Sequence, residues 1–434
     1  MSARDVARRV LARVEKGGAY ATLALDAELS RAGLDERDRR LATELTYGAL
    51  RNQLRLERAL AAHADLGRAP APVRHALVIA AYQLLMMRIP PHAAVDDAVG
   101  AVRAVHGAKL AGFCNAVLRK LAATGEPPLP AEPTARLATL HSLPAWIVDE
   151  LAAQLPAGEL ADACAALSAP PALWIRVNRA RAAVDEVIAA LAGEGAEVET
   201  TPLAPYALAV RGLGNPAASP SFQAGLWTVQ DLGAQLVGEL ATPLPGPRVL
   251  DACAGVGGKT TQLAEAAAAA GVAADITALD RAASKLELLA AAAGRLGLSG
   301  IRTEAIPLEA SPVAAFDLIV VDAPCSGLGV LRRHPEAKAR IMPPDVADLA
   351  RVQARLLDAA VARLAPGGVL VYAVCTLTRA EGPDQLAALL ARHPSLTVEP
   401  AALAPEVVSA GALRTWPHRH GADGFFAVRL RRAA

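Results

Sequence analysis

The stretch VLDACAGVGGKT, residues 249–260, decides the fold of the C-terminal half of the chain. Its apolar start predicts a short strand over Val249–Ala252, its glycines predict a tight turn, and a helix is predicted over Thr260–Ala270. This order is typical of an open α/β sheet, whose ligands bind at the carboxyl ends of the strands. Glycine lets the backbone approach a ligand, and the helix N-terminus presents free N–H groups to a carboxylate. The alternative is a tight turn that binds nothing.

Two nucleotide-binding motifs are excluded at this turn. The phosphate-binding pattern G-x-x-x-x-G-K-[ST] would need glycine at Cys253, and the dinucleotide pattern G-x-G-x-x-G would need glycine at Thr260. Asp280 ends the next predicted strand, where a carboxylate is placed to accept hydrogen bonds from ribose hydroxyls. A helix cap is the alternative role for Asp280. Together the two features suit a nucleoside cofactor without a phosphate chain, namely S-adenosyl-L-methionine.

Working outward, short apolar strands alternate with longer helices from residue 248 onward. The further strands are predicted at Ile276–Asp280, Phe316–Asp322 and Val369–Val374, and the further helices at Ala282–Leu296, Asp348–Leu364 and Gln385–Arg392. The alternation predicts a doubly wound parallel sheet in a Rossmann-like α/β domain over residues 236–434.

Two cysteines follow the last two of these strands. Cys325 stands beside Asp322 in VDAPCSG, residues 321–327, and Cys375 stands in LVYAVCT, residues 370–376. A single cysteine in such a place is more often a small buried hydrophobic residue than a nucleophile. Two of them at neighbouring strand ends, beside a cofactor turn, favour thiol chemistry.

Methylation of cytosine at C5 explains both thiols. C5 is too weak a nucleophile to attack a methyl sulfonium unaided, and a thiolate that adds to C6 converts the ring to an enamine. Removal of the C5 proton and expulsion of the thiolate then need acid–base groups, and Asp322 is placed to hold a proton at N3. Methylation of an amino group needs no thiol, so Cys325 and Cys375 argue against it.

The rest of the chain predicts two further domains. Residues 1–124 carry apolar positions at helical spacing, broken by glycine and proline, which indicates an all-α bundle. Four prolines in GEPPLPAEP, residues 125–133, predict a linker over residues 125–139. Mixed helix and strand patterns predict a small α+β module over residues 140–235.

Composition narrows the class of protein. Hydrophobic residues make up 53% of the 434 residues and charged residues 20%, which excludes wholesale disorder. No apolar stretch suits a membrane span or a secretion signal, so we expect a cytoplasmic protein without a membrane partner. Five cysteines without a C-x-x-C pair argue against disulfides and a zinc site, so no metal is expected. Residues 1–140 hold 20 Lys and Arg against 14 Asp and Glu, which favours an acidic partner such as RNA, although a genomic bias toward G and C would also raise Arg.

These motifs resemble those of one family over nearly the whole chain. The chain resembles the bacterial 16S ribosomal RNA cytosine-5 methyltransferases of the RsmB/Sun family. Upstream segments are similar to that family's NusB-like helical RNA-binding domain and to its middle module. The matching segments are CNAVLR (114–119), WIRVN (174–178), VQD (229–231), DACAGVGGK (251–259), DAPCSG (322–327), RRHPE (332–336), YAVCT (372–376), WPHRHG (416–421) and DGFF (423–426).

The resemblance implies a role for each residue of the site. It implies that Cys375 is the nucleophile, that Cys325 assists product release, that Asp322 contacts N3 and that Lys259 supports the active site. The swapped assignment of the two cysteines, as in DNA cytosine methyltransferases, is the alternative. Asp280 and Asp322 are implied to bind the cofactor together with the residues of the turn. The turn residues are Cys253, Ala254, Gly255, Val256, Gly257, Gly258 and Lys259.

Three positions depart from the family pattern. The turn reads Ala-Gly-Val where the family has Ala-Ala-Pro, and the nucleophile motif reads Val-Cys-Thr instead of Thr-Cys-Ser. The family's acidic residue near the adenine, expected around Glu304–Leu308, has no Asp here, and Ile306 or a neighbour stands in its place. Weaker recognition of the adenine is therefore predicted.

RNA contacts are predicted next to the thiols. Arg332, Arg333 and His334 follow the Pro-Cys loop and are predicted to grip the RNA backbone, with a solvated surface run as the alternative. A base that reaches two thiols must leave any helix, so a flipped or loop cytidine is expected. Small-subunit ribosomal RNA is the expected substrate. Methylation of transfer RNA and a NusB-like assembly factor without turnover are the alternatives. The sequence does not identify any protein partner.

Overall fold

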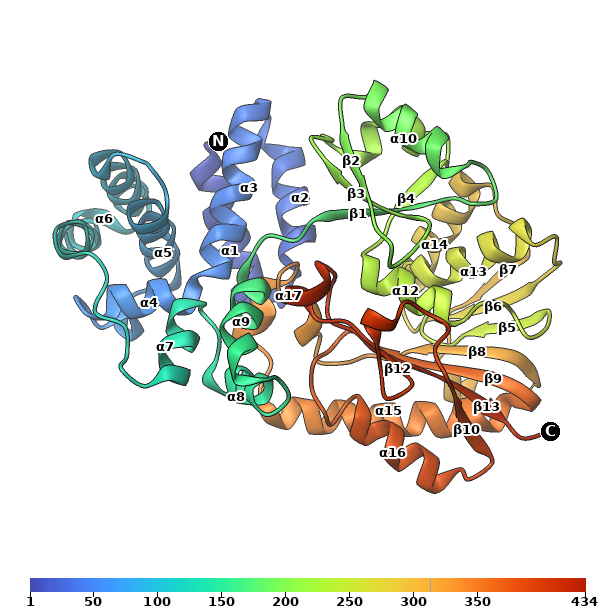
Figure 1. Ribbon diagram of the computed structural model, residues 1–434. Coiled ribbons are helices and arrows are strands. Elements are labelled where there is room, and N and C mark those ends of the chain that lie inside the picture. Colours follow the sequence, from blue (N-terminus) through green and yellow to red (C-terminus); the bar gives the residue numbers. More distant parts are fainter. Residues whose placement is uncertain (313) are drawn as a thin grey trace. The chain divides into compact units, whose positions relative to one another are not determined.

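The computed structural model describes residues 1–312 and 314–434 and divides into two compact units (Figure 1). One unit is helical and comprises Met1–Pro170 together with Leu331–Arg340. The other unit comprises Pro171–Val330 and Ile341–Ala434 and contains two β-sheets. No helix in the described part of the chain has the length and apolar character that crossing a membrane requires.

The helical unit begins with amphipathic helices that bury small and branched residues. Val6, Leu45, Leu77 and Leu118 come from different helices and share one core. The left-handed Gly18 ends the first helix, as its freedom to adopt positive φ allows. The helices of this unit are α1 (Ala3–Gly17), α2 (Ala21–Ala32), α3 (Glu36–Arg51), α4 (Gln53–Ala61), α5 (Ala71–Met86), α6 (Pro91–Thr124, interrupted at Gly107), α7 (Pro133–Leu140), α8 (Ala145–Ala152) and α9 (Leu160–Ser168).

The predicted linker is partly helical, which corrects the sequence analysis. Proline suits the first turn of a helix because its φ is already helical, and α7 begins at Pro133. The Glu132 carboxylate caps that turn by accepting the Thr134 and Ala135 N–H groups. The prediction treated proline only as a helix breaker. The compact helical unit then continues through α8 and α9, beyond the predicted end at residue 124.

The middle module is a small antiparallel sheet with helices, as predicted. The strand order is β2-β3-β1-β4, and Val187 and Leu191 of the module's longest helix pack on Ile175 and Trp227. The elements are β1 (Leu173–Val177), α10 (Val184–Gly193), β2 (Glu197–Thr200), β3 (Ala207–Arg211), α11 (Pro220–Gln223) and β4 (Trp227–Val229).

The large sheet is mixed, whereas a purely parallel sheet was predicted. Its order is β11-β12-β13-β9-β8-β5-β6-β7, with β10 paired to β13. The neighbouring strands β7, β6, β5, β8 and β9 run parallel to one another. Strand β13 pairs with β9 in the antiparallel direction. The strands are β5 (Arg248–Asp251), β6 (Asp275–Leu279), β7 (Ile301–Glu304), β8 (Phe316–Asp322), β9 (Leu364–Val374), β10 (Leu396–Glu399), β11 (Val408–Ser409), β12 (Ala412–Arg414) and β13 (Phe426–Arg432).

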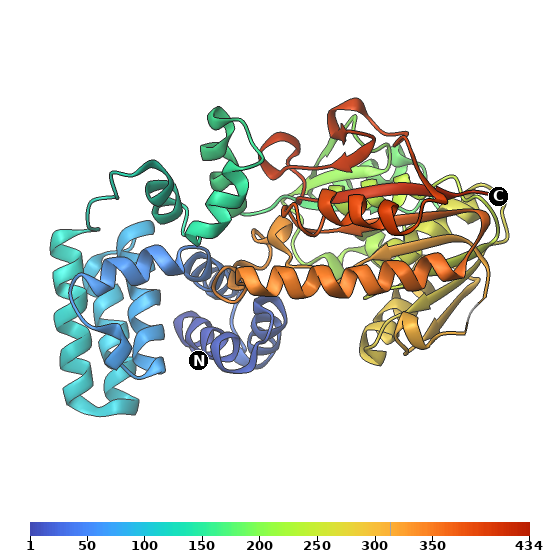
Figure 2. The same ribbon diagram turned by 90° about the horizontal axis from the view of Figure 1, so that it is seen from below.

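Helices cover both faces of this sheet (Figure 1). Leu236 and Leu263 pack with Val249 and Val371 on one face, and Leu357 and other apolar residues pack on the opposite face. Figure 2 shows the long α15 running along that second face. The helices are α12 (Leu232–Leu240), α13 (Gly258–Ala269) and α14 (Ala283–Leu296) on the first face, α15 (Pro343–Arg363) and α16 (Pro383–Arg392) on the second, and the short α17 (Pro417–His420).

A buried arginine joins the middle module to the glycine turn. Arg176 of β1 is 2% exposed and donates to the Glu265 carboxylate at 2.7 and 2.8 Å. It also donates to the Gly258 carbonyl at 2.9 Å and the Thr261 hydroxyl at 3.1 Å, in the first turn of α13. The module thus supports the helix that follows the turn.

Candidate active site

The glycine turn begins at a buried carboxylate. Asp251 ends β5 and is 1% exposed, and burial raises its pKa to about 6. The Thr260 hydroxyl donates to its Oδ2 at 2.6 Å. Gly257 has φ +87°, and a Cβ there would overlap the Leu289 side chain of α14. Glycine is therefore required at this position both by the backbone conformation and by packing.

Asp280, at the end of β6, shapes the turn from the other side. Its Oδ2 accepts the Gly255 N–H at 3.0 Å, and its Oδ1 accepts the Ala282 N–H at 2.8 Å. These bonds hold the turn but do not cap α14, whose N-cap is Ala282 without a side-chain cap bond, so the helix cap weighed as the alternative is not formed. The Asp280 carboxylate also lines the adjoining cavity, and its contact with a ribose stays a prediction.

A cavity of about 970 Å³ lies at the carboxyl ends of the parallel strands. Four of the predicted cofactor residues line it: Cys253, Gly255, Asp280 and Asp322. The other predicted turn residues lie nearby without lining it: Ala254 and Lys259 are buried, Gly257 and Gly258 open α13, and the Val256 side chain is 55% exposed.

One wall of this cavity lies where the resemblance placed the family's acid, around Glu304–Leu308. Ile306, the residue noted there, lines it, and Glu309 supplies a carboxylate three residues later that the sequence analysis did not name. The residues after β7 form no pattern that marks Glu309 as part of a cavity wall. The remaining lining residues are Ala252, Arg281, Ala282, Lys285, Pro307, Leu308, Ala310, Ala323, Pro324, Val352, Arg355 and Leu356.

An ion pair lies between the turn and the strand end of β8. Lys259 Nζ is 2.6 Å from Asp322 Oδ2, and it lies 5.3 Å from the centre of the Phe425 ring. Burial is the largest single effect and lowers the pKa of Lys259, but the charge and hydrogen bond of Asp322, with the charges of Cys375 and Asp251, together outweigh it, so the pKa lies above its usual value. The lysine is therefore cationic at neutral pH.

The two cysteines meet beside this pair. Cys325 Sγ lies 3.3 Å from Cys375 Sγ, within the range of a sulfur hydrogen bond. Hydrogen bonding to Cys375, together with burial, raises the pKa of Cys325 well above its usual value. The parallel pairing of β8 with β9 brings together thiols that are 50 residues apart in the sequence.

The residues predicted to grip RNA lie in a segment that packs with the helical unit. Arg332 is 5% exposed, which does not fit a direct contact of its side chain with phosphate. His334 packs edge-on against Tyr20, with ring centres 5.2 Å apart. Arg333 and His334 are half-buried, so their contact with RNA stays a prediction.

The same segment supplies charges to helix ends. Glu336 accepts the N–H of Ala21, at the start of α2, at 3.0 Å. Lys338 donates to the carbonyl of Arg51, at the end of α3, at 3.2 Å and to the Ser168 hydroxyl at 2.9 Å. Arg340 donates to the carbonyls of Val14, Gly18 and Ala19 around the end of α1. Each charge matches the partial charge of its helix end.

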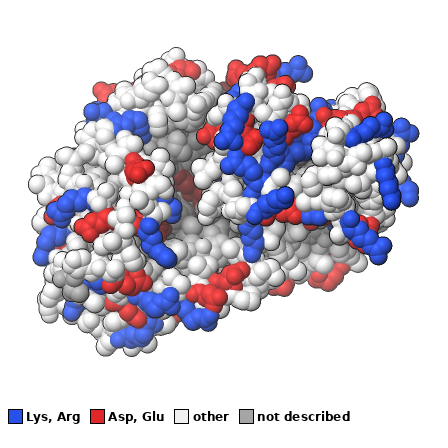
Figure 3. All heavy atoms as spheres, turned by 180° about the vertical axis from the view of Figure 1, so that it is seen from behind, with Lys and Arg blue, Asp and Glu red and all other residues white. Residues whose placement is uncertain are grey.

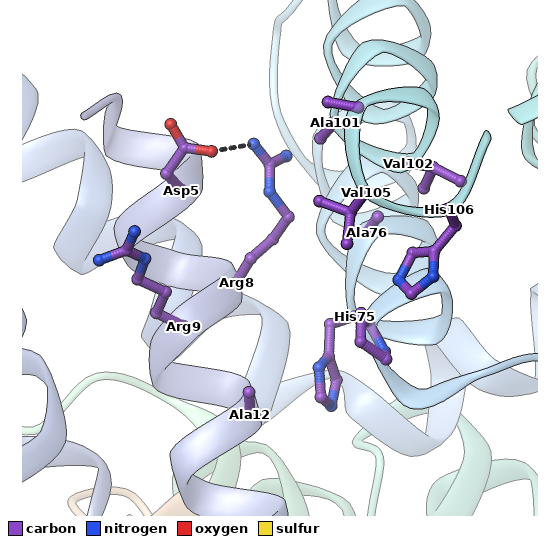
Figure 4. A pocket seen from close by; sticks show the side chains of 12 residues that line it. Asp5, Arg8, Arg9, Ala12, His75, Ala76, Ala101, Val102, Val105 and His106 are labelled. Atoms are coloured by element: carbon purple, nitrogen blue, oxygen red, sulfur yellow. Dashed lines mark hydrogen bonds and ion pairs between the residues drawn. The ribbon is translucent and has the colours of Figure 1, made fainter.

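A second cavity, of about 360 Å³, lies among α1, α5 and α6 (Figure 4). Arg8 in its wall is held by Asp5 at 2.7 Å and by Asp97 at 2.6 Å, and His75 bonds to Glu15. Arg8 and His75 therefore already bond to side chains of the helical unit. Figure 3 shows Lys and Arg interspersed with Asp and Glu on the face that it displays.

Comparison with protein-family models defines the class of protein. Residues 240–431 match the family model "16S rRNA methyltransferase RsmB/F", residues 1–123 match the NusB family, and residues 143–215 match the ferredoxin-like domain of RsmF/B-like methyltransferases. The fold and the site are therefore those of a methyltransferase with a NusB domain and a ferredoxin-like module.

Relatives that align with nearly the whole chain identify its family. The probable ribosomal RNA small subunit methyltransferase B of Bacillus subtilis (strain 168) is 35% identical over 99% of both chains. The ribosomal RNA small subunit methyltransferase B of Xylella fastidiosa (strain 9a5c) is 36% identical, over 98% of this chain and 99% of its own. The chain belongs to the RsmB/F family. The crystal structure of PH0851 shares the fold, with a TM-score of 0.85 at 23% identity over 100% of this chain and 99% of that one.

Proposed function

We propose that the protein transfers a methyl group from S-adenosyl-L-methionine to C5 of a cytidine in small-subunit ribosomal RNA, through a bond between Cys375 and C6. The observation that carries the proposal is the pair of thiols 3.3 Å apart, beside Lys259 and Asp322. Cytosine C5 needs covalent activation, which a thiol provides. The names of the relatives support ribosomal RNA as the substrate.

Charge favours Cys375 as the nucleophile. The charge of Cys375 contributes to the raised pKa of Lys259, so the ammonium group is close enough to stabilise a thiolate there. The pKa of Cys325 is raised by its hydrogen bond to Cys375 and by burial. Cys325 therefore keeps its proton and donates it in a hydrogen bond to the Cys375 thiolate.

The cavity beside the thiols suits S-adenosyl-L-methionine. Its apolar wall of Ile306, Leu308 and Leu356 offers a slot for the adenine, and Asp280 faces the ribose position. Glu309 is the carboxylate available on the wall where the family's acid is absent. Bound there, the cofactor supplies an electrophilic methyl group.

The residues of the chain then act in sequence. The Cys375 thiolate forms a bond to C6 as N3 takes up a proton, which Asp322 holds there. With the cofactor bound, C5 would then take the methyl group as the bond from that group to the sulfonium sulfur breaks, which would leave S-adenosyl-L-homocysteine. Once Cys375 is bonded to C6 its negative charge is gone, so Cys325 loses the partner that most raises its pKa. Cys325 then releases its proton to water more easily, and its thiolate is the base that removes the C5 proton. The electron pair of the C5–H bond re-forms the C5–C6 double bond, the C6–S bond breaks with its pair returning to Cys375, N3 releases its proton, and the ring regains its aromaticity.

We assign RNA binding to the helical unit as well. It matches the NusB family, and the first 140 residues hold 20 Lys and Arg against 14 Asp and Glu. Such a surplus attracts phosphate in a salt-dependent way.

The test is methyl transfer from labelled S-adenosyl-L-methionine to protein-free small-subunit RNA, with denaturing gels to detect RNA–protein adducts. We expect an active wild type, no transfer by Cys375→Ala, and a trapped adduct in Cys325→Ala because the base is missing. An adduct in Cys375→Ala would reverse the two roles. Transfer to transfer RNA alone would reject the proposed substrate, and transfer unaffected by either variant would reject the covalent mechanism.

A further inference from the structure

A buried carboxylate lies behind the two cysteine loops. Glu381 stands in the turn between β9 and α16 and is 0% exposed. A buried carboxylate is costly unless hydrogen bonds compensate it. The Glu381 side chain accepts from five neutral donors, and its backbone carbonyl accepts from the Tyr372 hydroxyl at 2.6 Å.

These donors come from both cysteine loops. Ser326, which follows Cys325, donates its N–H at 2.8 Å and its hydroxyl at 2.5 Å. Thr376, which follows Cys375, donates its hydroxyl at 3.3 Å and bonds to the Ser326 hydroxyl at 2.7 Å. The two residues that adjoin the thiols are therefore tied to one carboxylate.

The Glu381 carboxylate also accepts a hydrogen bond from helix α15. Gln353 of α15 is fully buried and donates to Glu381 Oε1 at 3.0 Å and to the Pro324 carbonyl at 2.9 Å. Thr378 adds a hydroxyl at 2.8 Å. Three separate segments thus meet at Glu381, which is more than a turn needs for its own stability.

We propose that Glu381 is a positioning residue for both thiols: its carboxylate ties the loop of Cys325 to the loop of Cys375 and holds the sulfur atoms within hydrogen-bond distance. The inference rests on the proposed function, because it assigns Glu381 a part in the same reaction. Glu381 acts through the two loops and does not touch the cytidine.

The negative charge of Glu381 has a second effect, which acts on the protonation of Cys325. The groups that face Cys325 are Tyr372 from β9, Cys375 directly after that strand, Glu381 from the turn and the Gly327 N–H from its own loop. After the hydrogen bond to Cys375, burial and the charge of Cys375, the charge of Glu381 also raises the pKa of Cys325. Glu381 thereby helps to keep Cys325 in the protonated form that donates to Cys375.

The test compares Glu381→Gln with the matched control Asp384→Asn. Both replace a carboxylate by an amide, but Asp384 pairs with Arg379 at 3.0 Å on the surface and bonds to neither Ser326 nor Thr376. The amide nitrogen of Glu381→Gln cannot accept from the three hydroxyls of Ser326, Thr376 and Thr378, and its two N–H groups can donate to only two of them. The variant also loses the negative charge, so the tie between the two loops is weakened. We expect kcat for methyl transfer to fall about 100-fold with KM for RNA and cofactor little changed, and Asp384→Asn to match wild type.

A proximity measurement does not depend on activity. Diamide, an azo oxidant, takes two hydrogen atoms from the Cys325 and Cys375 thiols, is itself reduced to the hydrazine, and leaves a disulfide between the two sulfurs. Closure is followed by mass spectrometry of the linked peptides in the full chain. We expect Glu381→Gln to close the disulfide about tenfold more slowly than wild type and Asp384→Asn.

The outcomes separate the two proposals. Closure by Glu381→Gln at the wild-type rate would overturn the positioning role, whatever the activity. A wild type that methylates no RNA would overturn the proposed function and leave the closure test intact. If Glu381→Gln does not fold, Thr376→Val releases the Cys375 side alone, and an unchanged closure rate in that variant would equally reject the inference.

Discussion

Lys259 carries the positive charge of the site at the scale of single residues. It reaches Asp322 at 2.6 Å, although the two residues are 63 positions apart in the sequence. Burial opposes its charge, but the neighbouring Asp322 raises its pKa above the usual value. The lysine therefore stays protonated through the neutral range.

Lys259→Met tests this charge while keeping a long side chain over Phe425. Without the ammonium group, a thiolate at Cys375 is less stable, so we expect the acid limb of the pH profile of kcat/KM to move to higher pH and kcat/KM at neutral pH to fall about 100-fold. The measurement is the pH dependence of methyl transfer under subsaturating RNA. Lys285→Met, on the other side of the turn, should leave the position of the limb unchanged. A limb that does not move in Lys259→Met would show that Lys259 does not stabilise the thiolate.

Single-residue features differ in how far they can be predicted. The two cysteines each follow a predicted strand, so their proximity could be expected from the sequence. Glu381 could not be found in this way, because its five donors belong to three segments and no local pattern joins them. The burial of Arg332 was missed for the same reason.

At the scale of secondary-structure elements, strand β1 contacts helix α13 and so supports the glycine turn that precedes the helix. Arg176 and Glu265 are 2% and 1% exposed at their side chains, so their ion pair is almost without water. Two further bonds from Arg176 reach Gly258 and Thr261 in the first turn of the helix. The middle module therefore bears on the geometry of the turn as well as on stability.

Arg176→Met leaves Glu265 as an unpaired buried carboxylate. We expect a loss of about 3–5 kcal/mol in the free energy of unfolding, measured by urea denaturation. The double variant Arg176→Met with Glu265→Met removes both charges and should recover a large part of that loss. A double variant as unstable as Arg176→Met would mean that the bonds to the α13 turn, and not the ion pair, dominate.

Strands were predicted where apolar runs are continuous and missed where they are not. The central β8 lies where Phe316–Asp322 was predicted, since a strand buried on both faces leaves a clear apolar signal. The edge strand β7, Ile301–Glu304, is mostly exposed and has three polar residues in a row, so it left no apolar signal. In β13, Arg429 and Arg431 look like surface residues in the sequence, but both bond to Glu399 of β10.

At the scale of the whole molecule, the chain order differs from the order of compact units. Residues 331–340 lie between the Cys325 loop and α15 in the sequence, yet they belong to the helical unit. Composition and periodicity could not predict that this segment belongs to the helical unit. Its ten residues do not indicate which distant helix ends they contact. Its placement depends on the hydrogen bonds that Glu336, Lys338 and Arg340 each make to a helix terminus.

Lys338 makes the stability of the molecule depend on pH. Burial, with the charge of Arg51 adding to it, lowers its pKa from 10.5 to about 7. Between these values the unfolded chain binds a proton here that the folded chain has released, so the free energy of unfolding rises with pH across that window. Below it both states are protonated and the full penalty applies.

Lys338→Met removes this dependence. We expect wild type to gain stability relative to Lys338→Met between about pH 7 and pH 9, measured by urea denaturation of both proteins at each pH. Comparing the two chains cancels the groups that titrate in both. Parallel curves would show that Lys338 does not change its protonation on folding in this range.

The discontinuous helical unit also restricts how its parts can be exchanged between proteins. The chain passes between the two units after residues 170, 330 and 340. A single recombination point after residue 170 would therefore transfer the first helices without the segment that caps α1, α2 and α3. A working chimera has to inherit both pieces together, so the NusB-like part of this chain is not a module that one cut and one splice can move.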